Sequence, residues 1–460
     1  MILPAFIFFL LLFLAVGLWA SSKSIDNTED YLLAGRKVSP WMAGLSAMAS
    51  LMSGFMFIGF IGLVYKIGIY ATWFFIGEIS GILLLTPWLQ QRIQQRSQQL
   101  RVQTFSGLLA KENGQKNHKL ITLIGVLTMI FLGIYAAAQL TAGGKALNNL
   151  FNWPQQSGIF IGGIMLMLYS YKGGIRASLW TDSVQAVVMF LAMIALCIAG
   201  LSQIGGFVQL HKMLSIIDPN LVNPFPKGPL AAALFFGGWL FAGLAVYSLP
   251  HVAVRYMVVS NQKEAKQAQF IFLITAILFM LLSTVVALLA RVLLSQLVDT
   301  EMALPAMTQL ILPDVFIGIV LAGIFASSMS SADSMVLSCS AALSQDVLPS
   351  WSKKLSWAKR STALVIASVM MISMWGPSGV FNLVVFAVGG MGSAFGPLLV
   401  LRALGKKPSE NTAIAMIICG LGVSLFWRYG LHLNTQVFEA APGVLSGFVV
   451  YGLNAFFTRE

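Results

Sequence analysis

The chain has 460 residues, of which 58% are hydrophobic and only 10% are charged. Soluble domains carry about 25% charged residues, so this composition excludes a soluble globular protein and indicates a membrane protein. The net charge of +12 would suit a nucleic-acid partner, but the basic residues lie between apolar stretches, where they orient a membrane protein. We therefore expect the lipid bilayer as surroundings, no nucleic acid, and no obligatory protein partner.

Thirteen stretches of the chain are apolar and long enough to span a membrane as helices, since a span needs about 20 residues. Their approximate ranges are 3–21, 41–65, 70–89, 120–142, 155–171, 177–201, 229–252, 268–292, 313–343, 360–376, 380–402, 411–429 and 437–457. We expect the longest polar interval, from about Gln90 to Lys119, to be a loop. The predicted fold class is an all-α polytopic membrane protein with a single transmembrane domain over 1–460.

The basic residues fall mostly on one side of the predicted spans. If the N-terminus is outside, 22 of the 28 Lys and Arg residues lie in cytoplasmic segments and 6 lie outside. Cytoplasmic segments of membrane proteins carry such an excess of positive charge. We therefore predict an integral plasma (inner) membrane protein with its N-terminus outside and its C-terminus in the cytoplasm.

Small residues interrupt two of the predicted spans. Ser50, Ser53 and Gly54 lie in the middle of the second span, and Phe236-Gly-Gly-Trp and a later glycine precede Pro250 in the seventh. Unwound backbone at membrane depth persists only where it lines a cavity or is buried in protein. A pair of interrupted spans in corresponding halves indicates the binding site of a transporter. Glycines that allow close helix crossing would explain each interruption, but not their separation by five spans.

Hydroxyl groups follow one face of the ninth predicted span. The serines recur at i, i+3, i+4, i+7 and i+11, which are the positions of one helical face: Ser327, Ser330, Ser331, Ser334 and Ser338. Lipid offers such a face no hydrogen bonds, so we expect it to point toward neighbouring helices or an ion. Hydroxyl and carbonyl oxygens suit a hard cation such as sodium. The alternative is that small serines allow close packing and bond their own helix.

Three carboxylates fall at membrane depth: Glu78, Asp182 and Asp333. Burying such a group costs roughly 2.5–3.5 kcal/mol on insertion scales, so a functional role is the first hypothesis. Asp182 either serves a cation or is a capping or ion-paired acid near the cytoplasmic surface. Glu78 either lines the aqueous path or bonds a neighbouring helix. Asp333 stands three residues after Ser330, toward the cytoplasmic end of its span, where it would guide the release of sodium. The sequence leaves the roles of Glu78 and Asp333 open.

Several stretches together resemble the sodium:solute symporter family, and within it the sodium/proline symporter branch. They are Asp30-Tyr-Leu-Leu-Ala-Gly-Arg-Lys, Ala49-Ser-Leu-Met-Ser-Gly, Gly173-Gly-Ile-Arg-Ala-Ser-Leu-Trp-Thr-Asp-Ser-Val-Gln, Pro250-His-Val-Ala-Val-Arg, Ala326-Ser-Ser-Met-Ser-Ser and Gly392-Ser-Ala-Phe-Gly-Pro. The resemblance implies a LeuT-type core of two inverted five-helix repeats with two discontinuous helices. The repeats would cover 41–201 and 229–402, with an extra helix at 3–21 and two more within 411–457.

The resemblance also implies sodium-driven uptake of a small organic solute by alternating access, with Na⁺ as the coupling ion. The main sodium site would use oxygens of residues at the first broken helix and the serine face: Ala49, Met52, Ser327, Ser330 and Ser331. A second sodium would lie between Asp182 and the hydroxyls of Ser330 and Ser331. The carboxylate of Asp182 would also offset some of the cost of holding two like charges close together.

The expected solute site lies at the unwound middles of the second and seventh spans and on the helix that faces them. Its candidate residues are Ser53, Gly54, Phe55, Tyr135, Gln139, Ala242, Val246 and Tyr247. The proline branch has an acid where this chain has Leu51, and aromatic residues where it has Ala242 and Val246. We therefore expect a roomier pocket for proline, another amino acid or a small carboxylate. The alternative is a sugar or a sialic-acid-type solute.

Other classes of membrane protein fit the sequence less well. No HExxH, GxSxG or P-loop pattern occurs, so we predict that the protein is not an enzyme. An ion channel would share polar helices but has no need of a broken, repeated pair. A membrane sensor without transport would need a large soluble region, and none is present within the chain.

Overall fold

The fold is almost entirely helical. The computed structural model describes residues 1–460 except 86–87, 113–114, 295, 353, 378 and 459–460. The helices of the first half are α1 (Ile2–Ser21), α2 (Thr28–Leu33), α3 (Pro40–Leu51), η2 (Phe55–Phe60), α4 (Ile61–Ile67), α5 (Thr72–Leu85), α6 (Leu89–Gln99), α7 (Phe105–Ala110), α8 (His118–Phe151), α9 (Gln155–Ile204) and α10 (Phe207–Ile217). Those of the second half are α11 (Pro229–Ala245), η5 (Val246–Ser248), α12 (Pro250–Met257), α13 (Gln262–Leu293), α14 (Ala303–Ile311), α15 (Asp314–Ala341), η7 (Ala342–Val347), α16 (Leu355–Trp375), α17 (Val380–Ala403), α18 (Glu410–Leu425), η9 (Phe426–Gly430) and α19 (Ala440–Thr458). Among the described residues, one small hairpin of β1 (Lys111–Glu112) and β2 (Gln115–Lys116) forms the only sheet.

Eleven helical runs within the described part of the chain are long and apolar enough to cross a membrane. Two of these runs, Phe55–Leu85 and Gln155–Ile204, contain 31 and 50 residues. At about 1.5 Å per residue, a straight 50-residue helix would be more than twice as long as a hydrocarbon core of about 30 Å. Gly68 and Gly174, both with positive φ, break these runs. The predicted number of thirteen spans depends on how the runs are divided, so it stays a prediction.

The break in α9 is covered by α2. Gly174 has φ 55°, and a side chain there would collide with the backbone of Tyr31, so both conformation and close approach require glycine. Two residues further on, the guanidinium of Arg176 donates to the buried carboxylate of Asp30 and to the Ala34 carbonyl at 3.1 Å. Two of the stretches that carry the family resemblance therefore meet at this bend.

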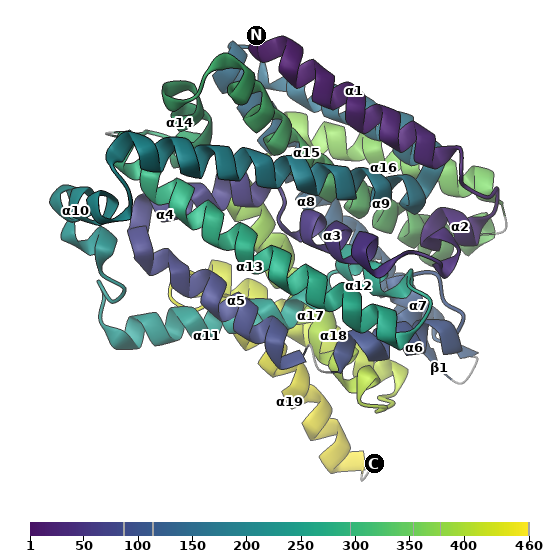
Figure 1. The fold of residues 1–460 in the computed structure, drawn as a ribbon. Coiled ribbons are helices and arrows are strands. Elements are labelled where there is room, and N and C mark those ends of the chain that lie inside the picture. Colours follow the sequence, from purple (N-terminus) through teal and green to yellow (C-terminus); the bar gives the residue numbers. More distant parts are fainter. Residues whose placement is uncertain (86–87, 113–114, 295, 353, 378, 459–460) are drawn as a thin grey trace.

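The centre of the bundle is built around α15. In its most apolar window 83% of the residues are buried, against 17% for α1, which lies at the edge of the bundle (Figure 1). The helices α8, α9 and α3 surround α15, while α18 and α19 pack on α17 at the opposite edge. A serine-rich helix thus occupies the most enclosed position in the molecule, as expected for a polar face that must avoid lipid.

Both predicted helix breaks are present, but their residues differ in one case. α3 ends at Leu51, and Met52 is non-helical (φ −77°, ψ 57°) before the chain turns helical again at Phe55. In the seventh predicted span, α11 continues through its glycines, and the break comes at Leu249 (φ −78°, ψ 114°), just before Pro250 begins α12. The prediction that the glycines interrupt this helix is wrong.

The glycines of α11 serve helix packing instead. A side chain at Gly243 would collide with the backbone of Glu78 on α5, and one at Gly238 with the backbone of Phe438. In return, Gly77 and Gly81 of α5 lie against the α11 backbone. Small residues let two helix backbones approach closely, so α5 and α11 form one of the tightest crossings in the bundle.

The interval from Gln90 to Lys119 is not a simple loop, contrary to prediction. It contains α6, α7 and the hairpin, and α6 packs on α12 and α13. The hydrophobic pattern did not reveal α6, because its buried side chains include Gln94 and Ser97. Arg36 donates to the Ser97 hydroxyl at 2.8 Å and to the Val102 carbonyl at 2.7 Å, so these polar groups find partners inside the protein.

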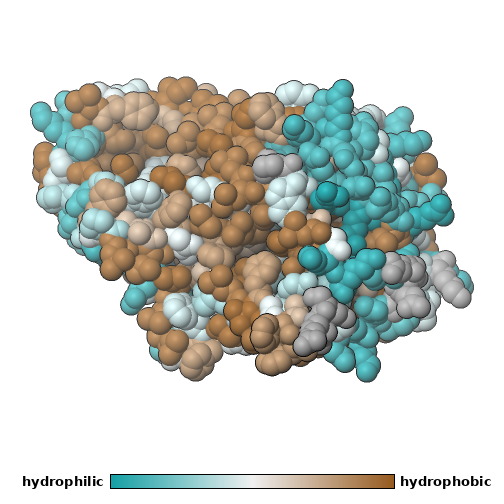
Figure 2. Space-filling model, turned by 90° about the horizontal axis from the view of Figure 1, so that it is seen from below, coloured by the Kyte–Doolittle hydropathy of each residue, from teal (hydrophilic) through white to brown (hydrophobic). Residues whose placement is uncertain are grey.

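The surface and the termini agree with a membrane-spanning protein. In Figure 2, apolar residues cover the middle of the visible face and hydrophilic residues gather at its two ends. The N-terminal amine meets Asp314 at 3.1 Å at one end of the bundle. Near the C-terminus, Asn454 of α19 accepts a hydrogen bond from Thr412 at the other end (Figure 1). The predicted sidedness stays a prediction; two basic residues counted for it, Lys353 and Arg459, lie outside the described residues.

Candidate functional site

The serine face of α15 meets the C-terminal end of α3. The Ser330 hydroxyl donates to the Ala49 carbonyl at 2.9 Å and to the Ser327 carbonyl at 3.1 Å. The Ser331 hydroxyl donates to the Ser50 carbonyl at 2.8 Å. The carbonyls of Ala49 and Ser50 are available because the last four C=O groups of a helix lack partners within it, and α3 ends at Leu51.

Four of the five residues expected at the main sodium site therefore lie together: Ala49, Ser327, Ser330 and Ser331. All are buried, and their hydroxyl and carbonyl oxygens are ligands that suit a hard alkali cation. Met52 lies in the non-helical break just beyond, and no hydrogen bond joins it to α15 in the described part of the chain.

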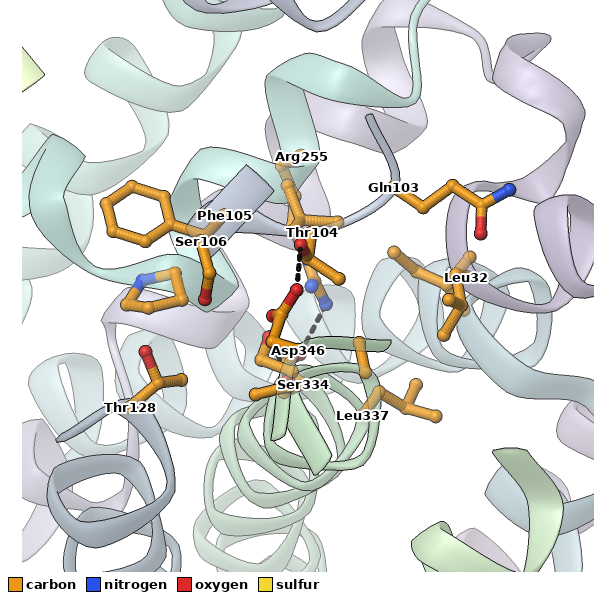
Figure 3. Close-up of a pocket in the computed structure, with 16 residues that line it drawn as sticks. Leu32, Gln103, Thr104, Phe105, Ser106, Thr128, Arg255, Ser334, Leu337 and Asp346 are labelled. Atoms are coloured by element: carbon orange, nitrogen blue, oxygen red, sulfur yellow. Dashed lines mark hydrogen bonds between the residues drawn. The ribbon is translucent and has the colours of Figure 1, made fainter. Parts of the chain in front are cut away.

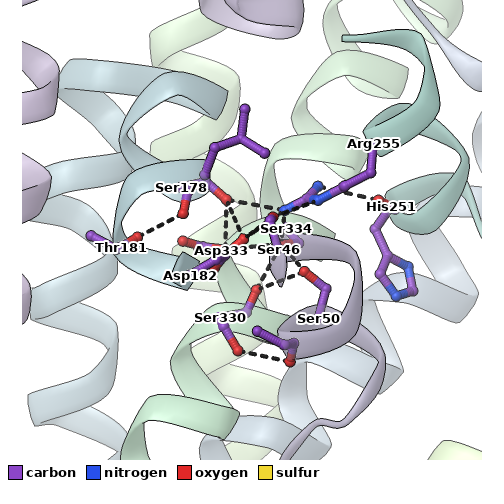
Figure 4. A network of polar contacts seen from close by, with 12 residues as sticks. Ser46, Ser50, Ser178, Thr181, Asp182, His251, Arg255, Ser330, Asp333 and Ser334 are labelled. Carbon is purple, nitrogen blue, oxygen red and sulfur yellow. Dashed lines mark hydrogen bonds and ion pairs between the residues drawn. The ribbon is translucent and has the colours of Figure 1, made fainter. Parts of the chain in front are cut away.

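A buried ion pair lies directly beyond these oxygens (Figure 4). Arg255 of α12 donates to the Asp182 carboxylate of α9 at 3.1 Å, and their side chains are 1% and 0% exposed. Ser46 of α3 donates to the same carboxylate and accepts from Arg255 at 3.1 Å. The sequence left two roles open for Asp182, a cation ligand or a capping or ion-paired acid near the cytoplasmic surface. The acid is ion-paired but fully buried, and its partner comes from the helix that follows the second break.

A second carboxylate completes this network. Asp333 of α15 accepts from Ser178 and Ser334, both at 3.0 Å, and Ser334 also accepts from Arg255. One carboxylate oxygen of Asp182 and one of Asp333 have no hydrogen-bond partner among the described residues. Two buried carboxylates thus face one guanidinium, so the network lacks one positive charge when both acids are ionised.

The two groups of oxygens are linked, but Asp182 does not contact the serines expected beside it. No hydrogen bond joins Asp182 to Ser330 or Ser331 within the described part of the chain. The connection runs through Ser334, which bonds the Ser330 carbonyl at 2.7 Å and the Ser50 hydroxyl at 3.0 Å. The serine face therefore forms a continuous line of oxygens from the break in α3 to the carboxylates.

Residues predicted for the solute lie on both sides of a narrow cavity of about 30 Å³, which has room for about two water molecules. Phe55, Tyr135, Ala242 and Val246 line this central cavity, together with Glu78, Met52 and Trp239.

The other predicted solute residues lie behind the cavity wall. The Ser53 hydroxyl is 3.4 Å from the Tyr135 hydroxyl, and the Gly54 amide donates to Gln139 at 2.8 Å. Tyr247 is fully buried, with its ring 6.0 Å from that of Tyr256. These residues support the cavity rather than line it.

Aromatic rings separate the central cavity from a larger vestibule of about 590 Å³. Trp239 and Val385 line both spaces. Trp239 stacks on Phe438 with ring centroids 4.6 Å apart and planes inclined by 8°, and Phe55 stacks on Phe381 at 5.4 Å. The central cavity is therefore closed toward the vestibule by stacked side chains.

On the opposite side, a small cavity of about 20 Å³ reaches the polar network (Figure 3). Arg255 and Ser334 form part of its lining. It is bounded by Thr104, whose hydroxyl donates to the Asp346 carboxylate at 2.9 Å. The oxygens of the site are thus enclosed from both ends of the bundle, and each end is closed by side-chain contacts rather than by backbone.

The sequence alone missed Ser46, Ser178 and Ser334 as partners of the charges. A signal was present, because Ser46, Ser50 and Ser53 follow i, i+4, i+7 spacing, and Ser178 precedes Asp182 by four residues. Arg255 stood in a stretch that resembled the family, yet nothing in its neighbourhood indicated Asp182 as its partner.

Comparison with known proteins decides the family. Residues 31–420 match the model of the sodium:solute symporter family. The chain belongs to the sodium:solute symporter family. The protein is therefore a sodium-coupled symporter of a small solute, with Na⁺ as its coupling ion, in agreement with the resemblance found in the sequence.

Curated relatives from this family cover almost the whole chain. The osmoregulated proline transporter OpuE of Bacillus subtilis (strain 168) is 28% identical over 94% of this chain and 90% of its own. The sodium/proline symporter of Escherichia coli (strain K12) is 27% identical over 94% of this chain and 88% of its own.

Solved structures show that this family member has the LeuT-type fold. A Na⁺-coupled sialic acid symporter in a substrate-bound outward-open state matches with a TM-score of 0.83 and 20% identity, covering 99% of this chain and 97% of its own. MhsT, in complex with L-phenylalanine, matches with a TM-score of 0.60 and 16% identity over 90% of this chain and 99% of its own. The prediction of a LeuT-type core with two discontinuous helices is confirmed.

Proposed function

We propose that this symporter imports a small amino acid, with proline as the first candidate, through the central cavity between its two broken helices. One observation carries the proposal: hydroxyls of Ser330 and Ser331 meet the carbonyls that the end of α3 leaves free, next to that cavity. An ion held there bonds both helices at once, so its binding can couple to the closure of the solute site by alternating access. We propose transport, and no enzymatic activity, for the chain.

The main sodium site of this proposal comprises Ala49, Met52, Ser327, Ser330 and Ser331. A cation there would replace the present hydroxyl-to-carbonyl hydrogen bonds, because each hydroxyl can turn its lone pairs toward the ion. Met52 would join through its carbonyl, which lies in the non-helical break and so is not committed to a helix hydrogen bond.

A second sodium is proposed near Asp182 on grounds of charge. Two buried carboxylates face a single guanidinium, and each keeps one oxygen without a partner among the described residues. A cation at that place would neutralise the excess negative charge. Since Ser334 links the carboxylates to Ser330, a second ion would share the serine face with the first.

The solute assignment rests on the relatives and on the size of the cavity. OpuE and the Escherichia coli relative are both named as transporters of proline. The central cavity has only about 30 Å³ of free space, even with the small side chains of Ala242 and Val246 at its wall, which suits a compact solute. A sialic-acid-type or sugar solute is the second candidate, because the solved structure that matches with a TM-score of 0.83 is that of a sialic acid symporter. The cavity wall offers few hydrogen-bonding groups for such a polyhydroxyl compound.

The deciding experiment is uptake of radiolabelled proline by purified protein in liposomes, with and without an imposed sodium gradient. Sodium-dependent accumulation against a gradient is expected, and it should be saturable, which separates a carrier from a channel. Ser283→Ala is the matched control for substitutions in the serine face, since the buried Ser283 hydroxyl donates to the Phe279 carbonyl of its own helix at 2.9 Å. Proline flux that ignores sodium would overturn the coupling, and a screen of sugars and sialic acid tests the second candidate.

We also propose a plasma-membrane location with the N-terminus outside and the C-terminus in the cytoplasm. Support comes from the unequal division of basic residues and from the two termini lying at opposite ends of the bundle. A fluorescent reporter fused after the C-terminus should be active in the cytoplasm, and a tag before Met1 should bind antibody on intact cells. Labelling of both ends from one side would contradict this arrangement.

A further inference from the structure

Among the described residues, Glu78 is the one acidic side chain at the wall of the central cavity. It lies midway along α5, on the same helix face as the buried Phe74 and Ile82, four residues to either side. Apart from Tyr135, the residues around it in the wall are aliphatic, sulfur-containing or aromatic without a hydroxyl, and they include Leu51, Met56 and Trp239. A carboxylate in such surroundings carries a cost that a partner must offset.

No partner for Glu78 is present in the described part of the chain. Neither a hydrogen bond nor an ion pair involves its carboxylate, whereas four other enclosed acids each have a basic partner. Asp30 has Arg176, Asp182 has Arg255, Glu301 has Lys145 at 2.6 Å, and Glu439 has Arg428 at 2.5 Å. Glu78 thus differs from the acids whose role is to hold helices together.

The backbone around Glu78 is held firmly. Gly243 of α11 lies directly against the Glu78 carbonyl, and Gly81 and Gly77 keep the two helices in contact along the crossing. This crossing fixes the carboxylate beside Ala242 and Val246, one helical turn before the break in α11. The acid is therefore positioned at the place where the solute is expected, and it cannot retreat with its helix.

The rings around Glu78 favour a cation in the cavity. Phe74 lies 3.8 Å from Trp239 between ring centroids, and Phe55 lies 6.0 Å from Phe74, so these faces enclose the space beside the carboxylate. Aromatic faces attract ammonium groups, and the attraction grows when water is excluded. An ammonium group would find both a counter-charge and ring faces here, whereas a hydroxyl-rich solute would leave most of its groups without hydrogen bonds.

The vestibule indicates that the solute also carries a negative charge. Lys66 and Lys227 line it with a single acid, Asp218, while the charge of Arg428 is matched by Glu439. This excess of positive charge repels a solute that is only a cation and tolerates one without net charge. A zwitterion carries no net charge for the vestibule to repel, and its ammonium group can pair with Glu78 in the cavity.

We propose that Glu78 is the recognition site for the ammonium group of a small zwitterionic solute, and that it excludes solutes without an amine. This inference rests on the proposed transport function and deepens it by assigning the group that selects the solute class. Glu78 acts as the counter-ion within the apolar wall, and the ion pair forms only when the solute enters.

The proposal can be tested by thermal unfolding of the purified protein in detergent, in the presence of three ligands that share a saturated five-membered ring. L-Proline has both charges, tetrahydrofuran-2-carboxylate replaces the ring nitrogen by oxygen, and pyrrolidine lacks the carboxylate. Each is titrated in sodium chloride and in potassium chloride, since choline chloride would itself offer an ammonium group. We expect stabilisation by proline in sodium, at least tenfold weaker binding of pyrrolidine, and no binding of the ether.

Glu78→Gln should weaken proline binding at least tenfold while the stabilisation by sodium alone stays as in the wild type. Asp314→Asn is the matched control, because Asp314 is an acid with 61% of its side chain exposed at the outer edge of α15. It should bind proline like the wild type. If Glu78→Gln does not fold, Glu78→Asp keeps the negative charge and should still bind proline but not the ether. The comparison of the three ligands on the wild-type protein also tests the proposal without any variant.

Other outcomes would overturn the proposal in distinguishable ways. Equal binding of proline and the ether removes the ammonium as the recognised group. Sugar or sialic acid binding that depends on Glu78 makes it a hydrogen-bond acceptor for a different solute class. A change confined to the pH dependence of uptake in Glu78→Gln makes it a proton carrier. If sodium does not stabilise the wild-type protein against thermal unfolding, the proposed function itself is contradicted, whichever of the three ligands binds.

Discussion

The polar network and the central cavity are neighbouring regions that differ in whether their polar side chains have partners within the protein. In the network, four helices contribute buried hydroxyls and charges, and most polar atoms bond protein partners. In the cavity, the wall is mostly apolar, and its one carboxylate, Glu78, has no partner among the described residues. Sodium always binds oxygen ligands, so the protein can place these oxygens before the ion arrives. The solute, in contrast, must itself bring the group that pairs with Glu78. Substitutions in the two regions should therefore affect different properties of the protein: stability and sodium binding in the network, and solute binding in the cavity.

The largest expected effect comes from removing the positive charge of the network. Arg255→Ala leaves the buried Asp182 without its ion pair, and breaking such a pair costs about 3–5 kcal/mol. We expect a large loss of thermal stability and of expressed protein, measured by fluorescence-detected size exclusion after heating. Lys359→Ala is the control, because Lys359 approaches the exposed Asp26 only at 3.9 Å, and such a pair contributes at most about 1 kcal/mol. Equal stability of the two variants would mean that the network has no structural role.

Ser331→Ala should separate ion binding from folding. It deletes one proposed sodium ligand, and a contact of a hydroxyl with a charged group contributes roughly 1.5–3 kcal/mol. The apparent affinity for sodium should fall by about ten- to a hundredfold in liposome uptake, at about 1.4 kcal/mol per factor of ten. The folded protein should remain, since the only hydrogen bonds lost are those of this hydroxyl to the Ser50 carbonyl at 2.8 Å and to the Ala49 carbonyl at 3.5 Å. Sodium dependence like that of the wild type would contradict the assignment.

Ala242→Trp probes the cavity by filling it. The cavity has only about 30 Å³ of free space, so an indole at its wall should exclude the solute. We expect proline uptake to fall by more than about tenfold, while overpacking lowers stability by about 1–3 kcal/mol. Stabilisation by sodium should persist, because Ala242 lies outside the serine face. Uptake kinetics that do not change would remove Ala242 from the solute path.

Asp182→Asn has the smallest expected effect on uptake and tests the second ion. If Asp182 serves a second sodium, the steepness of uptake against sodium concentration should fall from about two ions to about one. Solute affinity at saturating sodium should change less. The substitution also removes the pair with Arg255, so stability should fall in either case, but if the acid only pairs with Arg255 the steepness should not change. Charge moved per solute in liposomes gives the same answer independently, and a ratio of one sodium in the wild type would end the two-ion proposal.

The sequence by itself determined the membrane class, the serine face of α15 and the presence of two helix breaks five predicted spans apart. These features depend on local patterns, because hydropathy over about 20 residues and helical spacing are readable without knowing any distant contact. The motifs extended this to the family, and Ala49 and Ser330 do come together in the fold.

Only the tertiary structure decided what the glycines and the charges do. Glycine serves equally for a positive φ, as at Gly174, or for a close helix crossing, as at Gly243, and sequence does not distinguish these uses. The pairing of Asp182 with Arg255, and the lack of any partner for Glu78 among the described residues, depend on how distant helices are placed. Charges at membrane depth are costly wherever they lie, so their presence is visible in the sequence while their partners are set by packing alone.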